Sequence, residues 1–321
     1  AFDDVNFSAA PYNKTLARLE SLERPVVAAL HGHVLGGGLE LAMACHTRVA
    51  LPGTRLGLPE IKLGILPGSL GTQRLPRLVP VNVALDMMLS GKPIPVAEAL
   101  ALELVDAIED GQSSSEVGLS YAKKLCAKGG RGRVTKDLPV RSGSLESDFF
   151  EKKLTDIARK QKAYPAARAI VESVQACVTG SFESGELVEA RLFEECRKSS
   201  QSKALRHLFF AERESARIPG LDSRQPLRVV RKVGIIGAGT MGGGIAMNFA
   251  NVGISTLLLE AQEAALERGL ATVRKNYQNT VDKGRLSQEA MDQRMQCLQG
   301  TLKYEDLADC DLVIEAVFED M

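Results

Sequence analysis

One stretch decides the fold of the second half of this 321-residue chain: Lys232-Val233-Gly234-Ile235-Ile236-Gly237-Ala238-Gly239-Thr240-Met241-Gly242. Its first residues suit a short buried strand, and its last six fit the pattern G-x-G-x-x-G. In such a turn Gly237 permits the tight bend, Gly239 lets the backbone approach a pyrophosphate, and Gly242 lets helix and strand pack closely. The helix that follows would direct unpaired N–H groups and partial positive charge at the phosphates. The stretch predicts a Rossmann-type dinucleotide site formed by Gly237, Ala238, Gly239, Thr240, Met241 and Gly242.

The residues after this turn complete the expected unit. A helix to about Val252 is followed by a second strand, Ser255–Leu259, which ends at Glu260. An acid at that position accepts hydrogen bonds from the hydroxyls of the adenine ribose. No Arg or Lys occurs at 261–265, so a 2′-phosphate would meet repulsion without compensation. We therefore expect NAD, rather than NADP, as the cofactor.

Further elements expected in this half are two long helices and a strand, at Ala261–Asp282, Ser287–Leu298 and Asp311–Val317. This arrangement resembles the NAD-binding domain of the 3-hydroxyacyl-CoA dehydrogenases, in which a helical hairpin interrupts the Rossmann half. The resemblance implies that Ala316 and Glu319 approach the nicotinamide side of NAD. It also places the catalytic His of that family, and the Glu beside it, beyond Met321. Since hydride transfer needs a general base near the substrate hydroxyl, no residue is assigned to that role.

A second glycine-rich segment lies in the first half of the chain, at His31–Ala42 (HGHVLGGGLELA). It follows a buried strand candidate at Pro25–Leu30 and leads into a helix that carries Glu40 in its first turn. A second carboxylate, Glu60, comes directly after Pro59 in the next loop region. Taken alone, each glutamate also suits an ordinary position near a helix N-terminus.

Together these motifs resemble the enoyl-CoA hydratase/isomerase (crotonase) family over about residues 25–108. The resemblance implies that the Gly37 N–H stabilises the developing thioester enolate and that Gly38 allows close substrate approach. It implies that Glu40 positions and activates water, and that Glu60 delivers a proton to Cα. The same pair of carboxylates could move a proton between Cα and Cγ, which gives Δ3-to-Δ2 isomerisation. His31, His33 and His46 match no role in hydration, and Arg74 is expected to be a structural ion-pair partner.

The ends of the sequence suggest a fragment. Residue 1 is Ala, and nothing in Ala1–Arg24 resembles the loop that supplies the second oxyanion donor in crotonases. We therefore expect that donor upstream of Ala1, and we expect no hydratase turnover from these residues alone. The fold class expected is α/β: a crotonase-like domain incomplete at its N-terminus, helices, and a Rossmann domain incomplete at its C-terminus. The domain boundaries expected are 1–200 for the hydratase and its helices, 201–229 for a linker helix and loop, and 230–321 for the NAD-binding domain.

Composition narrows the class of partners. The 40 basic and 40 acidic residues balance, which gives no reason to expect nucleic acid or an anionic membrane as a partner. The six cysteines are scattered and show no metal-ligand spacing, so we expect reduced thiols and no metal site. The uncharged run Val233–Leu259 is interrupted by glycines and polar turns, so it is not expected to span a membrane.

A hydratase-like half followed by a dehydrogenase-like half resembles the multifunctional enzymes of fatty-acid β-oxidation, of the peroxisomal type or its bacterial relatives. The resemblance implies acyl-CoA thioester substrates, hydration to 3-hydroxyacyl-CoA, and its oxidation with NAD. The expected location is peroxisomal in a eukaryote and cytoplasmic in a bacterium; chain-length preference and oligomeric state stay open. Two alternatives remain: another crotonase chemistry, such as thioester hydrolysis or dienoyl isomerisation, and a non-catalytic scaffold that binds CoA and NAD.

Overall fold

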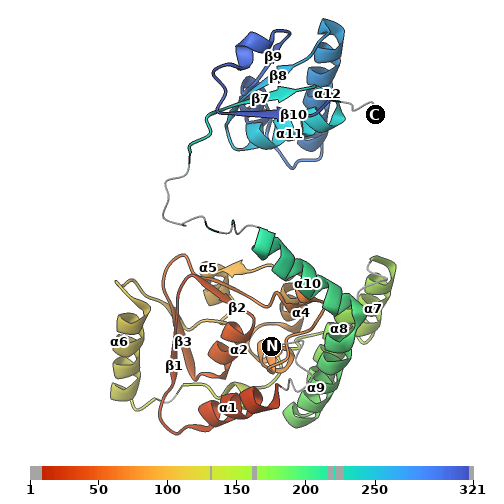
Figure 1. The fold of residues 1–321 in the computed structure, drawn as a ribbon. Coiled ribbons are helices and arrows are strands. Elements are labelled where there is room, and N and C mark those ends of the chain that lie inside the picture. The colour runs from red at the N-terminus through yellow and green to blue at the C-terminus, as the bar shows by residue number, and fades with distance from the viewer. Residues whose placement is uncertain are drawn as a thin grey trace. The chain divides into compact units, whose positions relative to one another are not determined.

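The computed structural model describes residues 9–130, 132–160 (backbone only at 160), 165–215, 218, 220 and 228–317. The chain divides into two compact units, residues 1–218 and 219–321. Each unit combines helices with mainly parallel strands (Figure 1). Each has an apolar core of its own. No helix in the described ranges is both long enough and apolar enough to cross a bilayer.

The first unit contains short strands and many helices. Its strands are β1 (Val27–Leu30), β2 (His33–Leu35), β3 (Thr47–Ala50), β4 (Arg55–Gly57), β5 (Ile94–Pro95) and β6 (Ala107–Ile108). Its helices are α1 (Ala10–Ser21), α2 (Gly37–Ala44), η1 (Glu60–Leu63), α3 (Gly71–Leu78), α4 (Val81–Ser90), α5 (Val96–Ala101), α6 (Ser114–Ala127), η2 (Thr135–Asp137), α7 (Phe149–Lys160), α8 (Pro165–Thr179), α9 (Phe182–Lys198) and α10 (Ser200–Ser215).

Two small sheets position the glycine-rich segment. One has the strand order β1-β3-β6 and the other β2-β4-β5, so the chain passes from the first sheet into the second between β1 and β2. In the second sheet His33–Leu35 runs parallel to Arg55–Gly57, and the Gly36 N–H donates to the Gly57 carbonyl at 3.0 Å. This pairing brings the start of α2 beside the segment that leads to Glu60. The two glutamates, far apart in the sequence, are thus carried by neighbouring backbone.

Helices build the remainder of the first unit (Figure 1). The α6 helix packs on β1 and β3, while α8 lies against α3, α4, α7 and α9. The apolar positions of α8 explain its central place, because Ile170, Val171 and Val174 are completely buried. The α10 helix contacts α9 and η1, and the Ser202 hydroxyl donates to the Leu63 carbonyl at 2.8 Å. The segment expected to begin a linker therefore packs on the first unit through its helical part.

The second unit is a Rossmann-type half. Its strands are β7 (Lys232–Ile236), β8 (Ser255–Leu259), β9 (Leu298–Thr301) and β10 (Leu312–Glu315), and its helices are α11 (Thr240–Asn251), α12 (Glu263–Asp282), α13 (Gln288–Gln296) and η3 (Tyr304–Leu307). The sheet is entirely parallel, with the order β10-β7-β8-β9. The strand order reverses between β7 and β10, and dinucleotides bind at such switch points in open α/β sheets.

Two elements differ from expectation. The polar composition of residues 112–116 is typical of a surface loop, but α6 begins at Ser114, where the Ser113 hydroxyl accepts the Glu116 N–H at 3.2 Å. That spacing of Ser and Glu is a capping signature at a helix start. The helix expected to continue to Leu298 ends at Gln296, and Leu298–Thr301 forms strand β9 beside β8. The strand has only four residues and alternates too little to be recognised alone.

Candidate functional site

The glycine-rich segment of the first unit turns sharply into α2. Gly36 precedes the helix with φ 56° and ψ −131°, a positive-φ conformation that suits glycine. A Cβ atom at this position would also lie 2.7 Å from Glu60 Oε1, so the space beside Gly36 is already occupied by a carboxylate. Gly37 and Gly38 follow as the first residues of α2 and are exposed. N–H groups of a first helical turn have no acceptor within the helix, so they are free to bind an oxyanion.

Glu40 lies beneath this turn with its carboxylate held on one side. Its side chain is 3% exposed, and Oε1 accepts the N–H groups of Ser69 and Gly71 at 2.7 and 2.9 Å. No described residue donates a hydrogen bond to Oε2, which would be 4.0 Å from a Cβ atom at Gly37. One carboxylate oxygen is thus fixed by the backbone, and the other faces the glycine turn.

Glu60 is the first residue of η1 and is only partly buried. Its Oε2 atom is buried and, within the described part of the chain, has no hydrogen-bond partner. An unpaired buried carboxylate oxygen is costly in the charged form, and protonation lowers that cost. Its surroundings therefore favour a neutral acid that can give up a proton.

The surroundings of the two carboxyl groups differ: those of Glu40 favour acceptance of a proton, and those of Glu60 favour donation of one. Burial raises the pKa of Glu40 to about 7, against the opposing effect of the N–H groups of Ser69 and Gly71 and the charge of Arg74. Burial, together with the charge of Glu40, raises the pKa of Glu60 to about 8. The backbone donors on Glu40 stabilise its ionised form, while Glu60 has no donor from another residue. Near neutral pH the arrangement suits Glu40 as base and Glu60 as acid.

The neighbouring basic and imidazole groups have structural contacts. Arg74 is buried and pairs with Glu20 at 2.9 Å, which confirms the ion-pair role expected for it. His46 is also buried, and its ring bonds to the Val26 N–H and the Glu20 carbonyl, both at 3.0 Å. His31 and His33 are exposed. No metal-binding group of three His, Cys, Asp or Glu side chains occurs among the described residues.

The dinucleotide turn of the second unit has the geometry that its glycines predict. Gly237 adopts φ 100°, and a Cβ atom there would lie 2.7 Å from the Ala316 carbonyl oxygen. At Gly242 a Cβ atom would lie 1.9 Å from the Gly237 carbonyl oxygen, so only glycine allows α11 to start so close to β7. Gly239 has nothing within 4 Å of its Cβ direction, which leaves the backbone open to a ligand. Thr240 and Met241 are exposed at the start of the helix.

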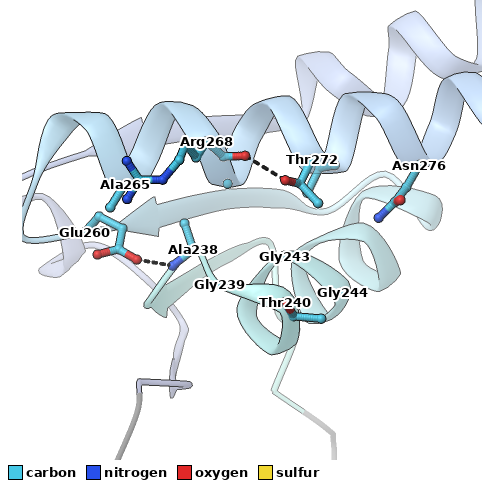
Figure 2. A pocket seen from close by; sticks show the side chains of 12 residues that line it. Ala238, Gly239, Thr240, Gly243, Gly244, Glu260, Ala265, Arg268, Thr272 and Asn276 are labelled. Carbon is cyan, nitrogen blue, oxygen red and sulfur yellow. Dashed lines mark hydrogen bonds between the residues drawn. The ribbon is translucent and has the colours of Figure 1, made fainter.

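A pocket of about 420 Å³ lies along this turn, between α11 and α12. Glu260 is at one end, where its Oε1 accepts the Ala238 N–H at 2.8 Å (Figure 2). Arg268 and Asn276, both on α12, line the pocket as well. In Figure 2 the Arg268 side chain extends from the helix toward the end occupied by Glu260. The sequence did not point to Arg268, because it lies outside residues 261–265, the segment that directly follows Glu260.

These residues fit NAD. The glycine backbone at Gly239 is open, the start of α11 offers unpaired N–H groups, and Glu260 is held in place by Ala238. Ala316 follows β10 at the switch point, where its N–H donates to the Ile236 carbonyl at 2.8 Å. The approach of Ala316 to the nicotinamide side of NAD stays a prediction. Glu319 lies outside the described residues.

Comparison with known families agrees with both sites. Residues 4–132 match the enoyl-CoA hydratase/isomerase family. Residues 232–321 match the NAD-binding domain of 3-hydroxyacyl-CoA dehydrogenase. The first match contains the glycine segment with Glu40 and Glu60, and the second contains the dinucleotide turn with Glu260. The fold is thus a crotonase-like region followed by a Rossmann-type NAD-binding region, as the sequence predicted.

Curated relatives contain both regions in one polypeptide. The chain is 40% identical over 308 residues to a glyoxysomal fatty acid beta-oxidation multifunctional protein of Cucumis sativus. It is 37% identical over 311 residues to a peroxisomal multifunctional protein of the same process in Arabidopsis thaliana, and 39% identical over 315 residues to a peroxisomal bifunctional enzyme of Cavia porcellus. Each alignment covers 94% of this chain and 42% of the relative, so the chain spans less than half the length of these proteins. The chain therefore joins an enoyl-CoA hydratase/isomerase region to the NAD-binding domain of a 3-hydroxyacyl-CoA dehydrogenase.

Proposed function

We propose that the protein acts in fatty-acid β-oxidation, adding water to trans-2-enoyl-CoA and oxidising the resulting 3-hydroxyacyl-CoA with NAD. The observation that carries the proposal is the contrast between two glutamates beside one glycine turn. Glu40 has one oxygen held by two backbone N–H groups, whereas the buried Oε2 of Glu60 has no partner among the described residues. Such a pair can take a proton from water and supply another to carbon without a metal ligand set.

In the proposed hydration, Glu40 accepts a proton from water while the oxygen of that water molecule bonds to Cβ of the enoyl thioester. Electron density moves to the thioester oxygen, where the N–H of Gly37 stabilises the enolate. Glu60 then gives its proton to Cα, which completes the addition of one water molecule. For Δ3-to-Δ2 isomerisation, the same two carboxylates would move a proton from Cα to Cγ.

The second unit would hold the NAD that the oxidation requires. Gly239 and the first N–H groups of α11 would bind the pyrophosphate, while Glu260 would accept hydrogen bonds from the adenine ribose. When bound, NAD would accept the hydride that leaves the hydroxyl-bearing carbon. We assign no general base for this step to the described residues.

Acyl-CoA thioesters are the proposed substrates, and sequential use by two sites in one chain would raise the local concentration of the 3-hydroxyacyl intermediate. The names of the plant and guinea-pig relatives support a peroxisomal location in a eukaryotic source. In a bacterial source we propose the cytoplasm. The oligomeric state is not part of the proposal.

The decisive experiment incubates the complete protein that contains these residues with trans-2-enoyl-CoA, first alone and then with NAD. We expect 3-hydroxyacyl-CoA in the first incubation, and 3-ketoacyl-CoA with NADH in the second. Glu98→Gln, at an exposed position of α5, is the matched control for variants of Glu40 and Glu60. Binding of enoyl-CoA and NAD without either product would contradict the proposal and favour a scaffold.

A further inference from the structure

The turn that holds Glu40 is itself held by a second carboxylate. Four consecutive backbone N–H groups, from Ser69 to Thr72, donate alternately to two glutamates. Ser69 and Gly71 donate to Glu40 Oε1 at 2.7 and 2.9 Å. Leu70 donates to Glu189 Oε1 at 2.6 Å, and Thr72 to Glu189 Oε2 at 3.1 Å. Each glutamate thus takes every second N–H group of the turn.

The turn needs such support because its backbone is strained. Leu70 has φ 69°, and it is one of two non-glycine residues with positive φ in the described part of the chain. A left-handed conformation is unfavourable for a residue with a Cβ atom, because that atom crowds the following carbonyl oxygen. Leu70 is also 2% exposed, so water does not satisfy its backbone. The hydrogen bond to Glu189 fixes this N–H group in the strained position.

Glu189 comes from α9 and is 1% exposed. The Thr72 hydroxyl also bonds to its Oε2 atom, and that hydroxyl lies 2.7 Å from the hydroxyl of Ser173 on α8. Among the described residues Glu189 forms no ion pair, so its buried carboxylate is satisfied by backbone and hydroxyl donors alone. Both oxygens act as acceptors, a task that a glutamine amide cannot perform, because its NH₂ group would face one of the N–H donors.

We propose that Glu189 is a positioning residue for Glu40. By fixing Leu70 and Thr72 it orders the turn that presents the N–H groups of Ser69 and Gly71, which in turn hold Glu40 Oε1. Glu40 Oε2 is then left toward Gly37, where the substrate would lie. The inference rests on the proposed function for its kinetic consequence, but its structural part can be measured independently.

The test compares Glu189→Gln with Glu195→Gln, which lies on the same helix in an exposed ion pair with Arg191. Amide hydrogen exchange, resolved to single residues, is followed at Ser69–Thr72. We expect loss of protection in Glu189→Gln at Ser69 and Gly71 as well as at the two residues that Glu189 contacts. In the complete protein, kcat for hydration should fall about 10–100-fold while KM changes less than about threefold, as for other residues that orient a reacting group. Glu195→Gln should change neither.

Thr72→Val is the second variant, for use if Glu189→Gln fails to fold. It removes one donor to Glu189 and leaves all four N–H groups, so we expect the same pattern with a smaller loss of kcat. Unchanged protection at Ser69 and Gly71, or an unchanged kcat in a variant with altered protection, would overturn the inference. If the unaltered protein hydrates no enoyl-CoA, the proposed function fails instead, and the exchange data still decide whether Glu189 orders the turn.

Discussion

Gly36 lies so close to Glu60 that a Cβ atom on the glycine would be 2.7 Å from Glu60 Oε1. The carboxylate of Glu60 therefore packs directly against the backbone of the glycine turn. This contact is possible only because residue 36 has no side chain. Gly32, earlier in the same segment, has a similar φ of 61° but nothing within 4 Å of its Cβ direction. Alanine substitutions at Gly36 and Gly32 therefore distinguish two effects. Both would strain the backbone, but only the one at Gly36 would displace the Glu60 carboxylate.

We expect Gly36→Ala to lower kcat for hydration at least about tenfold, because Glu60 must move away from its place beside the turn. Its unfolding free energy should also fall by about 1–2 kcal/mol from backbone strain. Gly32→Ala should also lose stability, since its φ is positive, but it should keep its kcat because its Cβ atom meets nothing within 4 Å. Hydration kinetics and urea denaturation of both variants provide the measurement, and an equal loss of kcat in both would contradict the prediction.

Replacement of either Glu40 or Glu60 should slow the chemical step of hydration. For Glu40→Gln and for Glu60→Gln we expect kcat to fall by about 10²–10⁴, since each removes one proton-transfer group. NAD binding to the second unit should be unaffected. Steady-state kinetics with enoyl-CoA and a fluorescence titration with NADH check the two parts. A variant that retains more than a tenth of the original kcat would remove its glutamate from the proposed role.

The stability of the first unit should fall as pH rises from about 5 to 8. Burial raises the pKa of Glu40 to about 7 and that of Glu60 to about 8. An unfolded glutamate releases its proton near pH 4.3, so over this range the unfolded chain binds fewer protons than the folded chain. A rise in pH therefore favours unfolding. The stabilisation that these protonated carboxyl groups give the folded chain is fully lost only above their folded pKa values.

Glu60→Gln should flatten this dependence, because the amide does not titrate. Each group that is protonated in the folded chain and ionised in the unfolded chain lowers the free energy of unfolding by up to about 1.4 kcal/mol per pH unit. Urea denaturation followed by circular dichroism at pH 5, 6, 7 and 8 gives the two curves, with Glu98→Gln as the control. Parallel curves for Glu60→Gln and the unaltered chain would show that Glu60 is ionised throughout.

Cofactor choice in the second unit should depend on the charge of Glu260. Glu260→Gln removes the carboxylate that would repel a 2′-phosphate, while Arg268 still lines the same pocket. We expect NAD to bind about tenfold more weakly and NADP about tenfold more tightly, each corresponding to one charged hydrogen bond or contact. Addition of Arg268→Ala should abolish the gain for NADP. Glu263→Gln, in the exposed first turn of α12, is the control in titrations with NADH and NADPH.

Helix and strand packing at the dinucleotide turn should tolerate no side chain at Gly242. Gly242→Ala would place its Cβ atom 1.9 Å from the Gly237 carbonyl oxygen, whereas Gly244→Ala meets nothing within 4 Å. We expect the first variant to lower the melting temperature of the second unit and the second to raise its stability by up to about 1 kcal/mol. Thermal unfolding by circular dichroism distinguishes them, and equal melting temperatures would contradict the packing role.

Local glycine patterns were sufficient to predict the dinucleotide turn and the strands on either side of its helix. The expected strands at Lys232–Ile236 and Ser255–Leu259 are confirmed. Such features depend on neighbours in the sequence and on one well-defined backbone conformation. The roles of Glu40, Glu60, Gly37 and Gly38 stay predictions, and the structure supplies the geometry against which they can be tested.

Other parts could not be predicted because their partners are distant or weakly patterned. Glu189 contacts Leu70 from 119 residues away, and on its own helix it resembles any polar position. Arg268 reaches the pocket of Glu260 only because α12 packs beside α11. Strand β9 is stabilised by β8 and by little in its own four residues. In each case tertiary packing, and not local preference, determines the outcome.

The contact of α10 with η1 affects how the protein can be divided into separately expressed parts. Ser202 reaches the Leu63 carbonyl, and a Cβ atom on Gly64 would lie 2.9 Å from the Ser202 Cα atom. Truncation at residue 200 would therefore expose the helix that begins with Glu60 and remove its outer wall. A separately expressed first unit that is to keep Glu60 in these surroundings should extend through residue 218, where the compact unit ends. The helix expected to belong to a linker is therefore part of the first unit and covers the backbone beside Glu60.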